Sequence, residues 1–193
     1  MDFRLPEELE MLKSTLRKFV DNELIPLDMH SQENGDLKAE TRQRLEQKTK
    51  AMGLWMFDVP EEYGGAGLGS LAQVVVWEEM CRTIALPSRG RGIFGPEIRP
   101  ILYALNNDQK KRFFYPILND GKELCFMQTE PDAGSDPGSM KTRAVRQGDH
   151  YIINGTKRFI TGAGDADFGQ LMAVTDPAKG SHGGISCFMV DMK

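Results

Sequence analysis

The first half of the chain carries apolar residues at spacings of three and four, the period of an amphipathic α-helix. The opening run starts after Pro6, has acidic residues in its favourable first turn and is expected to end near Pro26. Its apolar positions are Leu9, Leu12, Leu16, Phe19, Val20 and Leu24. A second, more polar helix is predicted from about Leu37 to Met52 and closes at Gly53.

Three further helices are expected before the pattern changes. They are predicted at about Ser70 to Arg82, Gly95 to Leu105 and Asn107 to Leu118. Ser70 and Asn107 are the candidate N-caps, because their side-chain oxygens can accept from free amides in the first turn. The middle helix is predicted despite Pro100, which donates no backbone hydrogen bond.

From Leu124 onward the period becomes that of β-strands. Six strands are predicted, at Leu124 to Thr129, Lys141 to Gln147, His150 to Asn154, Thr156 to Thr161, Gln170 to Thr175 and Ile185 to Asp191. Asn154-Gly155 is a strong two-residue hairpin signal. We therefore expect a tight turn there that holds the Lys157 to Thr161 strand against its neighbour.

A helical half thus precedes a β half, the order typical of an α+β fold. We expect an N-terminal helical domain at residues 1–122 and a β-domain at residues 123–193. No internal repeat or low-complexity tract interrupts either part.

Composition excludes several classes of protein. The chain has 24 basic and 28 acidic residues with no long basic run, which argues against nucleic-acid binding. No apolar stretch approaches the ~20 residues of a membrane span, and the N-terminus resembles neither a signal nor a transit peptide. We expect a soluble, cytoplasmic protein. The three cysteines, Cys81, Cys125 and Cys187, are interpreted as buried thiols.

Other apparent motifs are weak. Gly162-Ala163-Gly164 lacks the third glycine of a dinucleotide fingerprint. The histidines, His30, His150 and His182, are scattered and predicted to lie on the surface or in turns rather than at a metal. Glu78 and Glu79 are interpreted as a solvated or capping pair on a helix, not as a catalytic base.

The most informative block is Cys125 to Asp136. A strand carries the hydroxyl of Thr129 to the end of a sheet, and Glu130-Pro131 stops the ladder because proline donates no hydrogen bond. Gly134 then permits unusual dihedral angles, and the small residues around it allow amides to approach a phosphate. This arrangement favours an anionic ligand.

Two blocks resemble the acyl-CoA dehydrogenase family: Thr129 to Asp136 follows T-E-P-x-A-G-S-D, and Asn154 to Thr161 follows N-G-x-K-x-x-I-T. Val59 to Leu68 and Asp108 to Gly121 resemble the family's segments in the same order. The resemblance implies a helical domain followed by an antiparallel, barrel-like β-domain, here truncated. It also implies a C-terminal four-helix bundle that this chain lacks.

The resemblance further implies that FAD and an acyl-CoA lie between the domains. Thr129 would bond the pyrimidine side of the flavin, Thr161 would lie near its N5 and O4 edge, and Phe159 would pack on the rings. Ser135 would lie near the phosphates and also contact the CoA part of the substrate. The full implied cofactor set is Phe126, Met127, Gln128, Thr129, Gly134, Ser135, Phe159, Ile160 and Thr161. Phe159 stands where the family pattern has tryptophan, and Gly162 where it has asparagine.

The family's catalytic glutamate belongs to the C-terminal domain, so the resemblance implies no catalytic residue within the 193 residues. We expect the first half of an FAD-dependent acyl-CoA dehydrogenase, inactive alone. The complete protein is expected to be a homodimer or homotetramer that passes electrons to an electron-transferring flavoprotein. Two alternatives stay open: an acyl-CoA oxidase or nitroalkane-oxidase relative of the same fold, and a short non-catalytic paralogue that acts as a subunit partner.

Overall fold

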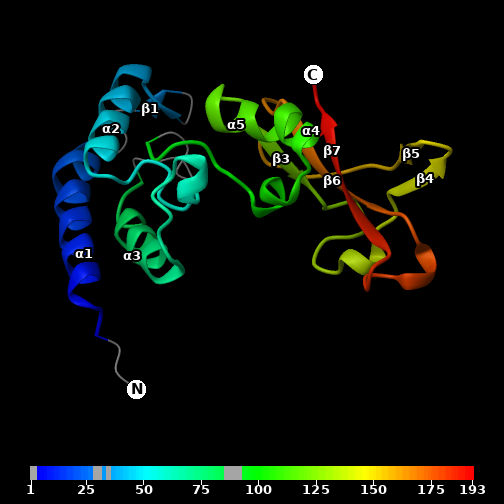
Figure 1. Cartoon of the computed structure of the whole chain (residues 1–193), viewed down its shortest axis with the longest axis horizontal. Coiled ribbons are helices and arrows are strands. Elements are labelled where there is room, and N and C mark those ends of the chain that lie inside the picture. Colours follow the sequence, from blue (N-terminus) through cyan, green and yellow to red (C-terminus); the bar gives the residue numbers. More distant parts are fainter. Residues whose placement is uncertain (1–3, 28–31, 34–35, 85–92) are drawn as a thin grey trace. The chain divides into compact units, whose positions relative to one another are not determined.

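The computed structural model describes residues 4–27, 32–33, 36–84 and 93–193. The chain divides into two compact units, Met1–Ile98 (unit 1) and Arg99–Lys193 (unit 2), which are described separately (Figure 1). Among the described residues, no helix is long and apolar enough to cross a membrane. The predicted domain boundary near residue 122 stays a prediction.

Unit 1 is built from helices, as its apolar period predicts. The longer ones are α1 (Glu7–Phe19), α2 (Ala39–Ala51) and α3 (Ser70–Met80), with a short 3₁₀-helix at Glu61–Tyr63 and the two-residue strands β1 (Gln32–Glu33) and β2 (Asp36–Leu37). α1 continues into a π-helical turn, Val20–Leu24. The predicted first and second helices are confirmed, and Gly53 ends the second in a left-handed conformation with φ of 70°.

The core of unit 1 lies where the three helices meet the loop around Phe57. Leu16, Val20 and Leu24 are fully buried along the apolar stripe of α1 and its π-helical extension. Phe57 packs edge-on against Phe94, with ring centroids 5.4 Å apart. Burying a side chain of this size contributes about 1.5–3 kcal/mol, so this stripe stabilises the packing of α1 in unit 1.

Three details of the predicted helices are wrong. Gly69, not Ser70, is the N-cap of α3, and Ser70 makes no capping bond. Asn106, not Asn107, caps α4 (Asn107–Gln109), in a capping box with Gln109. In place of a helix from Gly95, only a 3₁₀-helix forms at Pro100–Ala104, because proline disfavours helical geometry in the residue before it.

Unit 2 contains the remaining helices and one five-stranded sheet. From α4 the chain runs through a π-helical turn, Lys110–Phe114, into α5 (Tyr115–Asn119). The strands are β3 (Leu124–Met127), β4 (Arg143–Gln147), β5 (His150–Asn154), β6 (Phe168–Val174) and β7 (Ile185–Asp191). Their order is β3-β6-β4-β5, with β7 also paired to β6 (Figure 1). Phe113 packs edge-on against Phe168 at 5.3 Å and so joins the helical segment to β6.

The α+β class is confirmed, but the sheet is mixed and not closed into a barrel. β4–β5 and β6–β7 are antiparallel, whereas β6 pairs in parallel with β3 and, at one position, with β4. The parallel ladder arises because the chain leaves β3, makes the β4–β5 hairpin and returns to β3 in the original direction. A long excursion of this kind is what a parallel pair requires.

One predicted strand, Thr156 to Thr161, does not form. The β4–β5 hairpin turns at Gly148-Asp149, and Asn154-Gly155 ends β5 instead of forming a second hairpin. Gly155 serves close packing: a Cβ there would lie 2.2 Å from the Thr142 hydroxyl and 2.6 Å from the Thr142 Cα. Gly155 therefore allows the Thr142 backbone to come close. The local sequence does not distinguish a glycine needed for such close packing from a glycine needed for a turn.

The cysteine and histidine predictions hold in part. Cys125 is buried and Cys187 half-buried, but Cys81 is exposed, because it follows the last residue of α3. His150 and His182 are exposed, and His30 lies outside the described residues. Burial raises the pKa of the Cys125 and Cys187 thiols. The described residues contain no acidic, histidine or cysteine cluster that could hold a metal ion.

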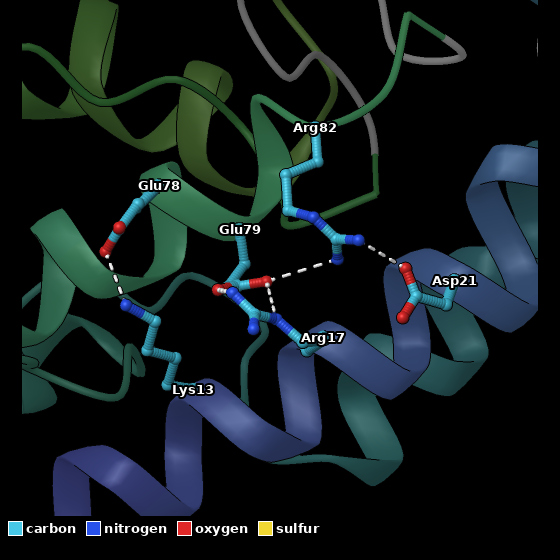
Figure 2. Close-up of polar contacts among 6 residues, drawn as sticks. All are labelled: Lys13, Arg17, Asp21, Glu78, Glu79 and Arg82. Carbon is cyan, nitrogen blue, oxygen red and sulfur yellow. Dashed lines mark hydrogen bonds and ion pairs between the residues drawn. The ribbon is translucent and has the colours of Figure 1, made fainter.

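Glu79 joins α1 to α3 through a network of charged side chains (Figure 2). Its carboxylate is fully buried and accepts two hydrogen bonds from Arg17, at 2.7 and 3.1 Å, and one from Arg82 at 3.3 Å. Arg82 also pairs with Asp21 at 2.7 Å. The interpretation of Glu79 as solvated is therefore wrong, whereas its neighbour Glu78 is exposed and pairs with Lys13 at 3.0 Å.

The first prediction concerns Glu79. Glu79→Gln should lower the free energy of unfolding by about 1–3 kcal/mol, because charged hydrogen bonds are lost while both arginines still reach water. The matched control Glu78→Gln should cost at most ~1 kcal/mol, since its ion pair is exposed. Urea unfolding followed by tryptophan fluorescence reports unit 1, where both tryptophans, Trp55 and Trp77, lie. Equal costs for the two variants would contradict the network's role.

The pH dependence of the same variant follows from the lowered pKa of Glu79, whose largest cause is the hydrogen bond from Arg17. A carboxyl with a lowered folded pKa contributes its full stability above its ordinary pKa of 4.5, and that contribution falls as pH drops through the folded pKa. The stability gap between wild type and Glu79→Gln should therefore shrink below pH 4.5. A gap that widens in acid would refute the assignment.

Candidate functional site

The first wall of the candidate site is the end of β3. Cys125 and Met127 point into the core of unit 2, and Phe126 and Gln128 alternate with them on the opposite face, half-buried. The Arg99 guanidinium lies 5.7 Å from the centre of the Phe126 ring. The alternation confirms the strand, but pairing with β6 ends at Met127, two residues before Thr129.

A tight turn follows. The Glu130 amide donates to the Ala133 carbonyl at 2.7 Å, and the Ala133 amide donates back at 3.4 Å. Gly134 and Ser135 follow this turn and are exposed. Gly134 is not among the glycines with positive φ, so the prediction of unusual dihedral angles there is wrong. Asp136 caps the next 3₁₀-helix by accepting from the Gly138 amide at 2.9 Å and the Ser139 hydroxyl at 2.6 Å.

The second wall is the segment 155–161, which lies against the first although it forms no strand. The Arg158 amide donates to the Thr129 carbonyl at 2.9 Å. The Lys157 ammonium donates to the Gln128 carbonyl at 3.0 Å. Ile160 packs on the cluster of Cys125, Met127 and Ala166. The two sequence blocks that carry the resemblance therefore meet in space.

Glu130 is the buried centre of this junction. Its carboxylate accepts from the Lys157 ammonium at 2.8 Å and from the amides of Lys141 at 2.6 Å and Thr142 at 3.0 Å. Burial raises the pKa of Glu130, but the Lys157 ion pair and the hydrogen bonds from Thr142 and Lys141 outweigh it and bring the pKa to about 2. The group is ionised at any physiological pH.

Phe159 projects from the second wall. Its side chain is 78% exposed, it has a left-handed backbone with φ of 57°, and the Arg158 guanidinium lies 4.3 Å from its ring centre. Such geometry is uncommon for a bulky residue and marks functional sites more often than chance. Gly162 has φ of 74°, which glycine and asparagine tolerate best, so glycine fits where the family pattern has asparagine.

The amides of Thr129, Ser135 and Thr161 have no acceptor within the part of the chain that the structure describes. Thr129 and Thr161 belong to the two segments that the Arg158 bond joins, whereas no hydrogen bond among the described residues ties Ser135 to them. Free amide donors beside an exposed aromatic ring can bind a flat, electron-rich ligand. Thr129, Phe159 and Thr161 thus fit a flavin ring system, and their roles and that of Ser135 stay predictions.

Reasoning from the sequence missed Glu130 and Lys157 as the residues that join the two walls. Both belong to the quoted motifs, and a signal was present: the ionisable residues of the two blocks are of opposite charge. The first block carries Glu130, Asp132 and Asp136, and the second carries Lys157 and Arg158. Thr142 was also missed, and no sequence feature points to it.

Comparison with known proteins agrees with the fold. The acyl-CoA dehydrogenase N-terminal domain matches residues 6–120, and the acyl-CoA dehydrogenase middle domain matches residues 125–193. The chain belongs to the acyl-CoA dehydrogenase family.

Individual relatives are similar over nearly the whole chain. The 3-(aryl)acrylate reductase of Clostridium sporogenes is 35% identical over 97% of this chain and 48% of its own length. The human mitochondrial short-chain specific acyl-CoA dehydrogenase is 36% identical, over 97% and 45%. A glutaryl-CoA dehydrogenase structure from Mycobacterium smegmatis, in complex with FADH2, matches with a TM-score of 0.70 at 27% identity, over 98% and 46%. The chain spans about half the length of the relatives it matches.

The second prediction tests the close packing at Gly155. Gly155→Ala should lower the free energy of unfolding of unit 2 by about 1–3 kcal/mol, because its Cβ would overlap the Thr142 backbone, which the bond to Glu130 holds in place. In the control, Gly134→Ala, the added Cβ meets nothing within 4 Å, and a change within ~0.5 kcal/mol is expected. Calorimetry measures both. Equal stability of the two variants would contradict the packing.

Proposed function

We propose that this chain forms the flavin-facing wall of an FAD-dependent acyl-CoA dehydrogenase. One observation carries the proposal: the 157–161 segment is hydrogen-bonded to the residues that follow β3. Thr129 and Thr161, both with free amides, therefore belong to two segments that are joined to each other. Because the chain belongs to the acyl-CoA dehydrogenase family, FAD is the candidate ligand of these two segments.

The residues that would hold FAD are Phe126, Met127, Gln128, Thr129, Gly134, Ser135, Phe159, Ile160 and Thr161. Bound FAD would supply two-electron oxidation, with hydride transferred to flavin N5. Amide and hydroxyl donors at Thr129 and Thr161 would stabilise the electron-rich reduced ring. The exposed ring of Phe159 would gain burial against the flavin, and Ser135 would bind the cofactor phosphates or the CoA part of the substrate.

The proposed reaction introduces a double bond between the α and β carbons of an acyl-CoA thioester. The human relative is named as a dehydrogenase, whereas the Clostridium sporogenes relative is named as a reductase of an acrylate, which contains such a double bond. We propose an acyl-CoA as substrate, an electron-transferring flavoprotein as acceptor, a homo-oligomer as the complete enzyme and the cytoplasm as its location.

The third prediction is that the purified chain retains FAD after gel filtration, with absorbance bands at about 370 and about 450 nm. Phe159→Ala should weaken FAD binding about tenfold, the value of one lost aromatic contact. Leu71→Ala, which truncates an exposed apolar side chain of α3 in unit 1, is the control and should leave affinity unchanged. A colourless wild-type chain would refute FAD binding by this half-site.

The fourth prediction is that the FAD-loaded chain does not oxidise butyryl-CoA or octanoyl-CoA. Between Gln128 and Thr161 the carboxylates are Glu130, Asp132, Asp136 and Asp149, and each already accepts a hydrogen bond. Glu130, the buried one, has a pKa of about 2 and is a poor base. Anaerobic loss of the band near ~450 nm is the measurement, and rapid bleaching by either thioester would contradict the prediction.

A second candidate function is a non-catalytic subunit partner. It is favoured by the apolar face of α3, where Leu71, Val74 and Trp77 are 52%, 60% and 40% exposed. Exposed apolar faces of this kind mark association surfaces. Co-elution with a separate C-terminal acyl-CoA dehydrogenase domain, lost in Val74→Lys, would favour this role.

Rapid reaction of the reduced flavin with oxygen in the complete enzyme would instead indicate an oxidase of the same fold.

A further inference from the structure

We propose that Glu130 and Lys157 are positioning residues: their buried ion pair holds the 157–161 segment against the end of β3 and thereby sets the relative placement of Thr129 and Thr161. The inference deepens the proposed function, because these two threonines are the candidate flavin contacts. Neither charged side chain is assigned to the ligand itself.

The 157–161 segment depends on few bonds. It belongs to no strand, so no ladder fixes its register. In the described part of the chain, three hydrogen bonds tie it to residues 128–130: those from the Lys157 ammonium to the Gln128 carbonyl and the Glu130 carboxylate, and that from the Arg158 amide to the Thr129 carbonyl. Two of the three come from one ammonium group.

Separating the Lys157 ammonium from the Glu130 carboxylate would cost free energy, because both groups are buried. The Lys157 side chain is 8% exposed and that of Glu130 3%. A charge removed from water to this degree is tolerated only when it is paired and hydrogen-bonded. A shift of the segment that separated them would leave both charges buried and unpaired, so the pair resists displacement more strongly than a surface ion pair would.

The Glu130 carboxylate is itself fixed from a third direction. The Lys141 and Thr142 amides, at the entry to β4, donate to its two oxygens. Glutamine could not replace it, because three donors converge on the group and glutamine offers only one oxygen acceptor. Three segments of unit 2 are therefore joined at a single side chain, one residue from Thr129.

The test measures backbone amide exchange at single residues by NMR in the 193-residue chain. Glu130→Gln and Lys157→Met should each speed exchange of the Arg158 amide about tenfold or more, because its bond to Thr129 loses support. The control is Asp132→Asn, which removes the exposed Asp132–Lys141 ion pair beside the site and should leave that amide unchanged. Unchanged Arg158 exchange in both single variants would overturn the proposal.

The double variant Glu130→Gln/Lys157→Met separates positioning from charge balance. It buries no lone charge, so its unfolding midpoint should recover most of what the single variants lose. Arg158 exchange should stay fast, because the bond from the ammonium to the Gln128 carbonyl is still absent. Recovery of slow Arg158 exchange in the double variant would show that the pair only balances charge and would overturn the proposal.

FAD titration, followed by quenching of flavin fluorescence, adds a ligand readout. Both single variants and the double variant should bind FAD more weakly than wild type, by about tenfold or more. This loss is expected because the ion pair no longer holds Thr129 and Thr161 in place. If the wild-type chain binds no FAD while the Arg158 results hold, the proposed function fails and the positioning role stands. If FAD binding is equally tight in wild type and all variants, the positioning role fails and the proposed function stands.

Discussion

Burying the Glu130 carboxylate requires that donors reach it from several directions, and this requirement determines how unit 2 comes together around the candidate site. The ammonium of Lys157 comes from the segment after β5, and the amides of Lys141 and Thr142 come from the approach to β4. Glu130 itself lies three residues beyond the end of β3. Because an unsatisfied buried charge is far more costly than an unsatisfied neutral group, segments that are distant in sequence are joined with little freedom.

Unit 1 also contains a buried carboxylate that requires donors, but there the donors remain partly exposed. Glu79 is also fully buried, but its partners Arg17 and Arg82 are 53% and 35% exposed, so their charges remain in contact with water. The network ties α1 to α3 and orients no ligand group that the sequence identifies. At Glu130 both members of the ion pair are buried, and the preceding residue in the chain, Thr129, is a candidate flavin contact. Because both charges are buried at Glu130, separating that pair costs more than separating Glu79 from its partly exposed arginines.

The sequence predicts what depends on local pattern. The amphipathic stripe of α1 and the bounds of β5 and β7 follow from periodicity, because each element packs one regular face. The failures share a non-local cause. Asn154-Gly155 has the chemistry of a hairpin, yet Gly155 is there because Thr142 packs against it, and nothing near Gly155 in the sequence reports Thr142. The parallel pairing of β3 with β6 depends likewise on where a distant strand returns.

The candidate site was predictable to a different extent. Resemblance placed Thr129 and Thr161 at one ligand, and the structure joins the two segments that carry them, but it could not indicate what holds these segments together. Residues that touch a ligand stand out by their functional groups, whereas residues that place them act through burial, which a sequence does not display. A carboxylate such as Glu130 would ordinarily be read as solvated or catalytic. Its low pKa and its three donors are consistent with neither, because a base must be free to accept a proton. The charge in the T-E-P motif thus fits the proposed positioning role and not the role of a base.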